Sequence, residues 1–214
     1  IAVTLIDALP RTVRDMPDFD GRSYAMSLAS VRMLQALGIW DGLENDAQPI
    51  LGVKVCDGRV GDGPGPFVME FDHAELEEGP LGHMIEDRHL RQVLLAATAD
   101  HPGSTDLSGK TVIDQAVEET GVQVTLSDGH ILAGALLIGA DGRGGADATR
   151  AGVARDVTAY RQSALVCAVA HERPHHGIAH QLFLPPGPLA ILPLTGNRSS
   201  IVWSEETRQA AAIH

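Results

Sequence analysis

The chain has 214 residues, of which 44% are hydrophobic and 21% are charged, so it is long and apolar enough to bury a core. This composition excludes intrinsic disorder, a collagen-like repeat and a disulfide scaffold. The formal net charge of −12 removes any general attraction to phosphate backbones, which argues against a nucleic-acid partner.

The sequence carries no sign of membrane insertion or export. No apolar run reaches the roughly 18 residues that a membrane helix needs, and no basic segment followed by an apolar one opens the chain. Its two cysteines, Cys56 and Cys167, lie far apart and outside any metal-ligand spacing, which is typical of a reducing compartment. We therefore expect a cytoplasmic protein.

The first predicted elements are a strand and a helix. Residues 1–6 form an apolar run typical of a strand buried on both faces of a parallel sheet, and the run ends in Asp7. A loop rich in Pro, Asp and Gly follows over residues 16–21. Apolar residues then recur every three or four positions over residues 26–37, which predicts an amphipathic helix closed by Gly38. This order indicates an α/β fold.

The next segments change from antiparallel strands back to the α/β pattern. Strands are predicted over residues 51–56 and 67–71, with a turn at Asp57-Gly58 between them. Residues 83–85 then predict a short strand that leads into a helix over residues 87–99.

The second half of the chain repeats both patterns. Strands are predicted over residues 112–118, 122–126 and 131–132, with a turn at Asp128-Gly129, and a fully apolar buried strand follows over residues 135–138. Beyond residue 160, the pattern predicts four more strands, over residues 163–169, 180–184, 190–194 and 199–204. Two patterns that alternate along the chain predict two interleaved layers or domains.

Two aspartates stand at the carboxyl ends of predicted strands. An acid at the position of Asp7 binds a ribose in dinucleotide-binding folds, although an acidic turn residue before a proline loop gives the same pattern. Asp141 lies within Gly-Ala-Asp-Gly (139–142), where small residues let the backbone approach a ligand. The phosphate loop G-x-G-x-x-G, which should precede the ribose acid by about 20 residues, does not occur in the chain.

Four segments carry a resemblance to a known family. VQVTLSDGHILAGALLIGADG (122–142) ends in an Asp-Gly that resembles the second signature of the single-component flavin-dependent aromatic hydroxylases. Three further segments resemble the ubiquinone-biosynthesis branch of that family: GRSYAMSLASVRMLQALGIWDGL (21–43), LGHMIEDRHLRQVLLAA (81–97) and LAILPLTGNRSSIVWS (189–204). The similarity spans nearly the whole chain in the family's order.

The resemblance implies an α/β fold in which a partial, Rossmann-like FAD-binding domain is interleaved with an antiparallel β-sheet substrate domain. The FAD-binding domain would comprise residues 1–48 and 84–157, and the substrate domain residues 49–83 and 158–214. Both would be incomplete in this chain. FAD would be the cofactor, and NAD(P)H would be the reductant.

The resemblance also implies four cofactor-binding residues. Asp7 would bind the adenosine ribose of FAD, and Arg22 would lie against the flavin or the pyrophosphate. Glu86 would face the ribityl chain, and Asp141 would support the pyrophosphate region. The alternatives are a surface arginine after a glycine turn for Arg22 and an acid favoured by the helix dipole for Glu86.

The chain departs from the family pattern in two ways. The family follows its Asp-Gly by a Ser and an Arg, whereas the corresponding positions here are Gly145 and Ala148, and Arg150 stands two positions later. The family's Gly-rich loop would precede Ile1, and its second flavin-binding motif would follow His214. We therefore expect an internal fragment that is inactive alone.

The implied function is a monooxygenase that hydroxylates the aromatic ring of a polyprenylated phenol in ubiquinone biosynthesis. Its partners would be this small-molecule substrate and, because of the prenyl tail, the surface of the inner membrane or a biosynthetic complex. No acid, base or nucleophile is assigned as catalytic, since the cofactor carries the chemistry. The alternative is a non-catalytic α/β ligand-binding or interaction domain that has lost flavin binding.

Histidines crowd one segment of the chain, at His171, His175, His176 and His180. Pro174 and Gly177 interrupt any helix there, and alternate residues of a strand face opposite sides. We therefore expect no metal site and interpret the segment as a polar loop between two strands.

Overall fold

The structure is a computed structural model and describes residues 1–213. The chain divides into two compact units that alternate along the sequence. Unit 1 comprises Ile1–Met16 and Leu95–Thr158, and unit 2 comprises Pro17–Leu94 together with the described residues from Ala159 onward.

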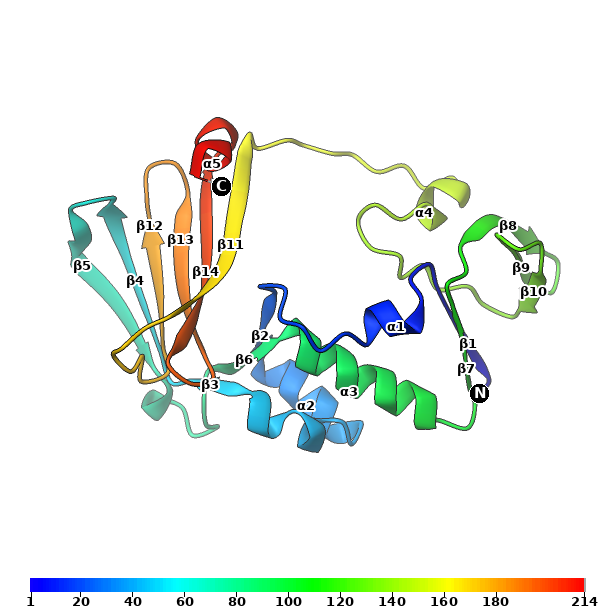
Figure 1. Cartoon of the computed structure of the whole chain (residues 1–214), viewed down its shortest axis with the longest axis horizontal. Helices are drawn as coiled ribbons and strands as arrows, with labels where there is room; N and C mark the ends of the chain where they lie inside the picture. The colour runs from blue at the N-terminus through cyan, green and yellow to red at the C-terminus, as the bar shows by residue number, and fades with distance from the viewer. Residues whose placement is uncertain (214) are drawn as a thin grey trace. The chain divides into compact units, whose positions relative to one another are not determined.

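Unit 1 contains a parallel strand pair and a three-stranded antiparallel sheet (Figure 1). β1 (Val3–Asp7) pairs in parallel with β7 (Ser104–Ser108), so Asp7 lies opposite Ser108 where both strands end. The antiparallel sheet has the order β10-β9-β8 and consists of β8 (Val112–Glu118), β9 (Gly121–Leu126) and β10 (Ile131–Gly134). The short helices are α1 (Arg11–Arg14) and α4 (Asp147–Arg150).

Two predictions for unit 1 are wrong. Residues 135–138 form no strand, and Leu136 and Ile138 are each 76% exposed. A buried strand needs neighbours for its backbone groups, and none of the described strands pairs with this segment. The apolar run at residues 1–6 does form a strand, but β7 is its one neighbour in the described chain and its first residues are exposed. The turn at Asp128-Gly129 is confirmed, because Gly129 has a φ of 85°.

Unit 2 is built on a six-stranded sheet with the order β11-β14-β13-β12-β4-β5 (Figure 1). Its strands are β4 (Gly52–Arg59), β5 (Gly63–Asp72), β11 (Gln162–Ala170), β12 (Ile178–Phe183), β13 (Pro188–Leu194) and β14 (Arg198–Glu206). Neighbouring strands are antiparallel except β12 and β4, which run parallel and join two distant parts of the chain.

The strands predicted at residues 51–56 and 67–71, and the four beyond residue 160, are confirmed. The turn predicted at Asp57-Gly58 is wrong, because both residues lie inside β4, where the register shifts between Cys56 and Gly58. The chain reverses at residues 60–62 instead, where the Asp62 N–H donates to the Arg59 carbonyl.

A smaller antiparallel sheet and several helices complete unit 2. The sheet has the order β2-β6-β3 and consists of β2 (Ser23–Ser27), β3 (Gln48–Ile50) and β6 (Gly82–Glu86). The helices are α2 (Leu28–Ala36), α3 (Asp87–Asp100), α5 (Thr207–Ile213) and the short η1 (Trp40–Gly42), η2 (Glu44–Asp46) and η3 (His73–Glu75). The predicted strand-to-helix passage at β6 and α3 is confirmed, and α3 continues from unit 2 into unit 1.

The helix α2 begins two residues later than predicted, because residues 23–27 pair with β6 as a strand. Ser27 ends that strand and caps the helix, since its Oγ accepts the Ser30 N–H at 3.2 Å. Gly38 follows the helix with a φ of 69°, as its predicted closing role requires. The inward face of α2 belongs to a core cluster of Val31, Leu34, Trp40, Leu43, Ala47 and Ile85.

A second core cluster joins the two sheets of unit 2. Met84 of β6 and Ile50 of β3 pack with Ala179 of β12 and Leu194 of β13, and Phe19 packs against the same cluster. The end of β6, where α3 begins, is therefore fixed against the six-stranded sheet. The predicted mixed α/β class is confirmed, although the helices are few and most strand pairs are antiparallel.

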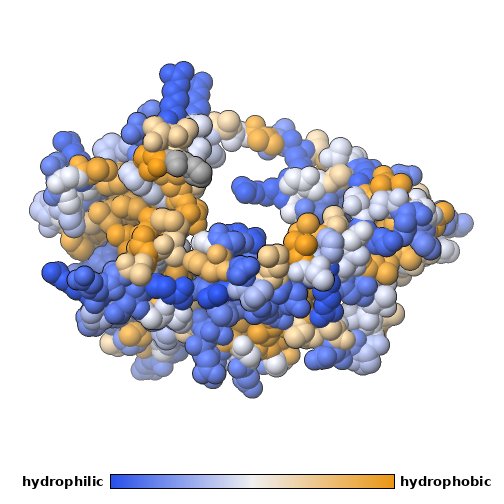
Figure 2. All heavy atoms as spheres, in the orientation of Figure 1, coloured by the Kyte–Doolittle hydropathy of each residue, from blue (hydrophilic) through white to orange (hydrophobic). Residues whose placement is uncertain are grey.

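Apolar side chains also remain exposed on the six-stranded sheet, and Figure 2 shows them gathered over it. Phe67, Met69 and Phe71 alternate along β5 and share one face, and all three are exposed. Within residues 1–213, no helix has the length and hydropathy required to cross a membrane.

Candidate functional site

Asp7 lies at the carboxyl end of β1, as its predicted role requires. Its Oδ1 accepts the Leu9 N–H at 2.8 Å, and its Oδ2 lies 3.5 Å from Nη1 of Arg14. The side chain remains 35% exposed. The Asp7 carboxylate is thus held from two sides and still accessible to a hydrogen-bond donor.

Arg14, Asp106 and Ser108 form a polar cluster beside Asp7 that the sequence did not reveal. The Arg14 side chain is 8% exposed, and its Nη2 donates to both Asp106 oxygens at 2.9 and 2.7 Å. Nη2 also contacts the Ser108 hydroxyl, which donates to Asp106 Oδ1 at 2.5 Å. The Ser108 hydroxyl and the Arg14 guanidinium hold the pKa of the Asp106 carboxyl below its usual range. The signal available in the sequence was the D-x-S spacing, which puts Asp106 and Ser108 on one side of a strand.

Asp141 lies in the loop between β10 and α4 and organises that loop. Its Oδ2 accepts the N–H of Asp147, the first residue of α4, at 3.1 Å. Arg150 continues the network, since its Nη1 lies 2.9 Å from Asp147 Oδ1 and its Nη2 lies 2.6 Å from the Val112 carbonyl oxygen. The displaced arginine therefore ties α4 to the start of β8.

Gly145 sits directly against the Asp141 carboxylate. A Cβ built on Gly145 would lie 1.8 Å from Cγ of Asp141, so any side chain at this position would displace the Asp141 carboxylate. Glycine at this position thus leaves room for the Asp141 carboxylate, which a serine side chain would displace.

Arg22 lies immediately before β2, and two carboxylates hold its guanidinium. Its Nε and Nη2 lie 2.8 and 2.6 Å from Asp20 Oδ2, and Nη2 lies 3.1 Å from Asp87 Oδ2. Hydrogen bonding to Arg22 lowers the pKa of Asp20, and Asp20 in turn raises the pKa of Arg22. The Arg22 side chain is nevertheless 58% exposed, so it can meet an anionic or polar group from solvent.

Glu86, the last residue of β6, is 1% exposed and faces two arginines. Its Oε2 accepts a hydrogen bond from Nε of Arg88 at 2.8 Å. Nη2 of Arg198 lies 2.6 Å from Oε1, close enough for an ion pair although not aligned for a hydrogen bond. Both guanidiniums also lie over the Phe19 ring, at 5.6 and 5.9 Å from its centroid. Glu86 thus neutralises part of a compact arginine pair.

The structure brings two of the predicted residues together. Ser23 pairs with Glu86 in the β2–β6 ladder, and the Asp87 N–H donates to the Arg22 carbonyl at 3.0 Å, so Arg22 and Glu86 share one end of that ladder. Both belong to unit 2, whereas Asp7 and Asp141 belong to unit 1.

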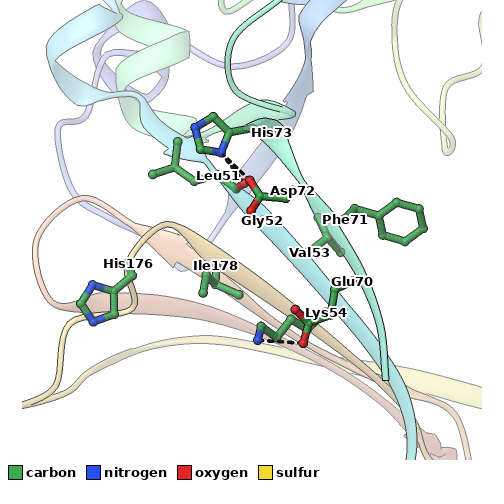
Figure 3. Close-up of a pocket in the computed structure, with 10 residues that line it drawn as sticks. All are labelled: Leu51, Gly52, Val53, Lys54, Glu70, Phe71, Asp72, His73, His176 and Ile178. Carbon is green, nitrogen blue, oxygen red and sulfur yellow. Dashed lines mark hydrogen bonds and ion pairs between the residues drawn. The ribbon is translucent and has the colours of Figure 1, made fainter. Parts of the chain in front are cut away.

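A cavity of about 330 Å³ opens along β4 and β5, and none of the predicted cofactor residues lines it (Figure 3). Its charged groups already pair with one another. Lys54 Nζ lies 2.9 Å from Glu70 Oε1, and His73 Nδ1 donates to the Leu51 carbonyl at 2.8 Å. This cavity therefore does not add to the candidate cofactor site.

In the histidine-rich segment, His171 and His175 make hydrogen bonds that stabilise the loop between β11 and β12. His175 accepts the Gly177 N–H at Nδ1 and donates from Nε2 to the Leu194 carbonyl at 2.8 Å. His171 Nε2 lies 2.9 Å from the Ser199 hydroxyl. Among residues 1–213, no group of three or more His, Cys, Asp or Glu is arranged to hold a metal ion.

The fold defines the class of protein. The chain superposes on Pseudomonas aeruginosa PqsL, described as a probable FAD-dependent monooxygenase, with a TM-score of 0.79 and 16% identity over 98% of this chain and 55% of that one. It also superposes on a variant of Klebsiella pneumoniae HpxO in complex with FAD, with a TM-score of 0.70 and 17% identity over 94% of this chain and 56% of that one. The chain therefore has the fold of FAD-dependent monooxygenases. No family model matches it.

The sequence is similar to those of hydroxylases that act on ubiquinone or its precursors. The chain is 40% identical to ubiquinone hydroxylase UbiL of Rhodospirillum rubrum over 97% of its length and 47% of that protein. It is 31% identical to 3-demethoxyubiquinol 3-hydroxylase of Escherichia coli over 94% of its length and 51% of that protein. The resemblance to the ubiquinone-biosynthesis branch of the FAD-dependent hydroxylases is confirmed. The chain spans about half the length of these curated relatives.

Proposed function

We propose that the protein is an FAD-dependent monooxygenase that hydroxylates the aromatic ring of a polyprenylated phenol in ubiquinone biosynthesis. The observation that carries this proposal is the 40% identity to a ubiquinone hydroxylase along 97% of the chain. The fold supports it as well, because the chain superposes on a probable FAD-dependent monooxygenase and on a protein solved with bound FAD.

The residues present fit part of an FAD site. The Asp7 carboxylate is anchored and accessible, which suits an acceptor for ribose hydroxyls. The half-exposed Arg22 guanidinium suits the pyrophosphate or the polar edge of the flavin. Asp141 would support the pyrophosphate region indirectly, by orienting the loop that leads into α4.

Glu86 contributes differently in this proposal. Its buried carboxylate already faces Arg88 and Arg198, so we propose that it positions these two arginines. Its direct contact with a ribityl chain stays a prediction.

In this proposal, the two predicted domains have different roles. We propose that residues 1–48 and 84–157 serve the cofactor and residues 49–83 and 158–214 serve the substrate. All six strands of the large sheet fall within the second set, which supports this assignment. When bound, FAD would supply the redox chemistry, with NAD(P)H as reductant and O₂ as the source of the inserted oxygen. The chain's own residues would bind, orient and shield the reactants.

The proposed substrate carries a small phenolic ring and a long apolar tail. The exposed apolar residues Phe67, Met69 and Phe71 on β5 provide a surface that such a tail can cover. We propose a cytoplasmic enzyme that reaches its substrate at the surface of the inner membrane or within a biosynthetic complex, because prenyl tails partition into lipid.

The first test is FAD binding by the full-length protein. We expect a yellow protein with absorption near about 450 nm, and stoichiometric quenching of FAD fluorescence on titration of the apoprotein. The holoenzyme with NAD(P)H and a short-chain prenylated phenol should add one oxygen atom to the ring, as measured by mass spectrometry. Asp7→Asn should weaken FAD binding, and Asp15→Asn is its matched control, because Asp15 is an exposed aspartate of the same unit.

The same titration separates the second candidate, a non-catalytic α/β domain that has lost flavin binding. The substitutions Gly145 and Ala148 in the Asp-Gly segment favour that candidate. A full-length protein that binds no FAD would reject the monooxygenase proposal and leave the non-catalytic one.

A further inference from the structure

We propose that Arg14 is a positioning residue for the ribose-binding acid, and that Asp106 and Ser108 fix Arg14 in that role. This inference rests on the proposed function, because it assigns the ribose of FAD to Asp7. It concerns three residues that neither the sequence pattern nor the family resemblance singled out.

The cluster is assembled from three separate segments of unit 1. Asp7 ends β1, Arg14 ends α1, and Asp106 and Ser108 lie near the end of β7. The parallel pairing puts Asp7 opposite Ser108, so the carboxyl ends of both strands present polar groups to the same guanidinium. Such convergence at strand ends is where open α/β folds bind ligands.

The two ends of the Arg14 guanidinium have different partners. Nη2 is committed to Asp106 and Ser108, at 2.9 and 2.7 Å from the Asp106 oxygens. Nη1 lies 3.5 Å from Asp7 Oδ2. Because the guanidinium is planar and buried, fixing Nη2 also fixes the direction in which Nη1 points.

Asp7 is consequently oriented from both of its oxygens. The Leu9 N–H holds Oδ1, and the Arg14 charge attracts Oδ2. The remaining lone pairs of this accessible carboxylate can accept the hydroxyl groups of a ribose without reorganisation.

If Arg14 only stabilised the fold, its substitution would weaken FAD binding equally with and without the Asp7 carboxylate. A double-mutant cycle distinguishes this structural role from the positioning role. The dissociation constant for FAD is measured by fluorescence quenching on the full-length protein and its Arg14→Gln, Asp7→Asn and doubly substituted variants. We expect Arg14→Gln to weaken FAD binding about tenfold, because a charge-assisted contact orients the acceptor. In the Asp7→Asn background, the same substitution should have little further effect.

Two further variants guard against a folding artefact. Arg14→Lys keeps the charge but replaces the planar guanidinium by one ammonium group, so it should recover only part of the affinity that Arg14→Gln loses. Its denaturation midpoint shows whether it folds. Arg59→Gln, at an exposed arginine of unit 2, should leave FAD binding unchanged.

The outcomes are distinct. Equal losses of affinity from Arg14→Gln in both backgrounds, or unchanged affinity in every Arg14 variant, would overturn the positioning role while leaving the proposed function intact. Failure of the unsubstituted full-length protein to bind FAD would overturn both.

Discussion

At the scale of single residues, the end of β6 carries Glu86, the most deeply buried charged residue described in unit 2. Glu86 lies among Arg88, Arg198 and the Phe19 ring, and it is the carboxylate that both guanidiniums share. Taking ions out of water is costly, so each charge in such a group depends on its partners. Removing the shared carboxylate leaves two like charges close together.

We predict that Glu86→Gln lowers the free energy of unfolding of unit 2 by about 3 kcal/mol, since it breaks a buried ion pair. Urea denaturation followed by tryptophan fluorescence measures this, because Trp40 and Trp203 both belong to unit 2. The matched control is Glu78→Gln, which breaks the Arg32–Glu78 pair whose side chains are both 58% exposed and should cost less than about 1 kcal/mol. Equal costs for the two substitutions would contradict the assignment.

His83 on β6 is a second residue whose environment is unfavourable for charge. Burial lowers the pKa of its imidazole below 6.5, and its buried Nδ1 has no hydrogen-bond partner among the described residues. The Trp40 ring lies 5.0 Å away, edge to face. The folded state therefore favours neutral His83, and the unfolded state takes up the proton first as the pH falls.

We predict that unit 2 loses stability as the pH falls below about 6.5, and that this His83 contribution levels off below the folded-state pKa. His83→Leu should reduce the pH dependence of urea unfolding in that range, and the remainder includes His180, whose pKa burial also lowers. His176→Asn is the control, because His176 is exposed and has a φ of 53°, which Asn tolerates. A pH dependence that survives His83→Leu unchanged would argue against His83 as its source.

At the scale of elements, the loop between β10 and α4 shows how a departure from the family pattern is accommodated. Asp141 reaches the first N–H of α4, and Gly145 leaves room for its carboxylate. A serine at position 145 would displace the carboxylate. The serine would therefore break the hydrogen bond from the Asp147 N–H to Asp141 Oδ2, and the backbone would not need to rearrange.

We predict that Gly145→Ser destabilises unit 1 by about 1 kcal/mol, which is typical of a lost helix-terminal hydrogen bond. Amide hydrogen exchange should show faster exchange at Asp147, and far-UV circular dichroism should show the loss of stability. Gly144→Ser is the control, because a Cβ on Gly144 meets nothing within 4 Å. In an Asp141→Ala background, Gly145→Ser should have no effect; a full effect there would refute the explanation.

Elements were predictable where periodicity alone specifies them. α3 and the strands at residues 163–169 and 199–204 carry strong patterns and are confirmed. β2 was missed because Met26 fits the helical spacing of α2, and only pairing with β6 makes residues 23–27 a strand. β7 was missed because Ser104–Ser108 is polar and is a strand only through its pairing with β1. The apolar residues 135–138 show the converse, since an apolar run without a neighbour forms no strand.

At the scale of the whole molecule, each of the two units is built from two separate segments of the chain. The six-stranded sheet combines β4 and β5, which end at residue 72, with four strands that begin at residue 162, and the parallel pair β4–β12 joins the two sets. The change of pattern along the sequence predicted such interleaving. Which strands became neighbours depended on contacts between distant segments, which no local pattern encodes.

The sequence by itself determined the α/β class, most of the elements, the family resemblance and the four residues expected at the cofactor, because periodicity and motifs are local properties. The tertiary structure decided which groups surround those residues. It paired Glu86 with Arg88 and Arg198 and set Arg14 beside Asp7. Asp7 and Asp106 are far apart in the sequence, and only the parallel pairing of β1 with β7 brings both to one buried guanidinium.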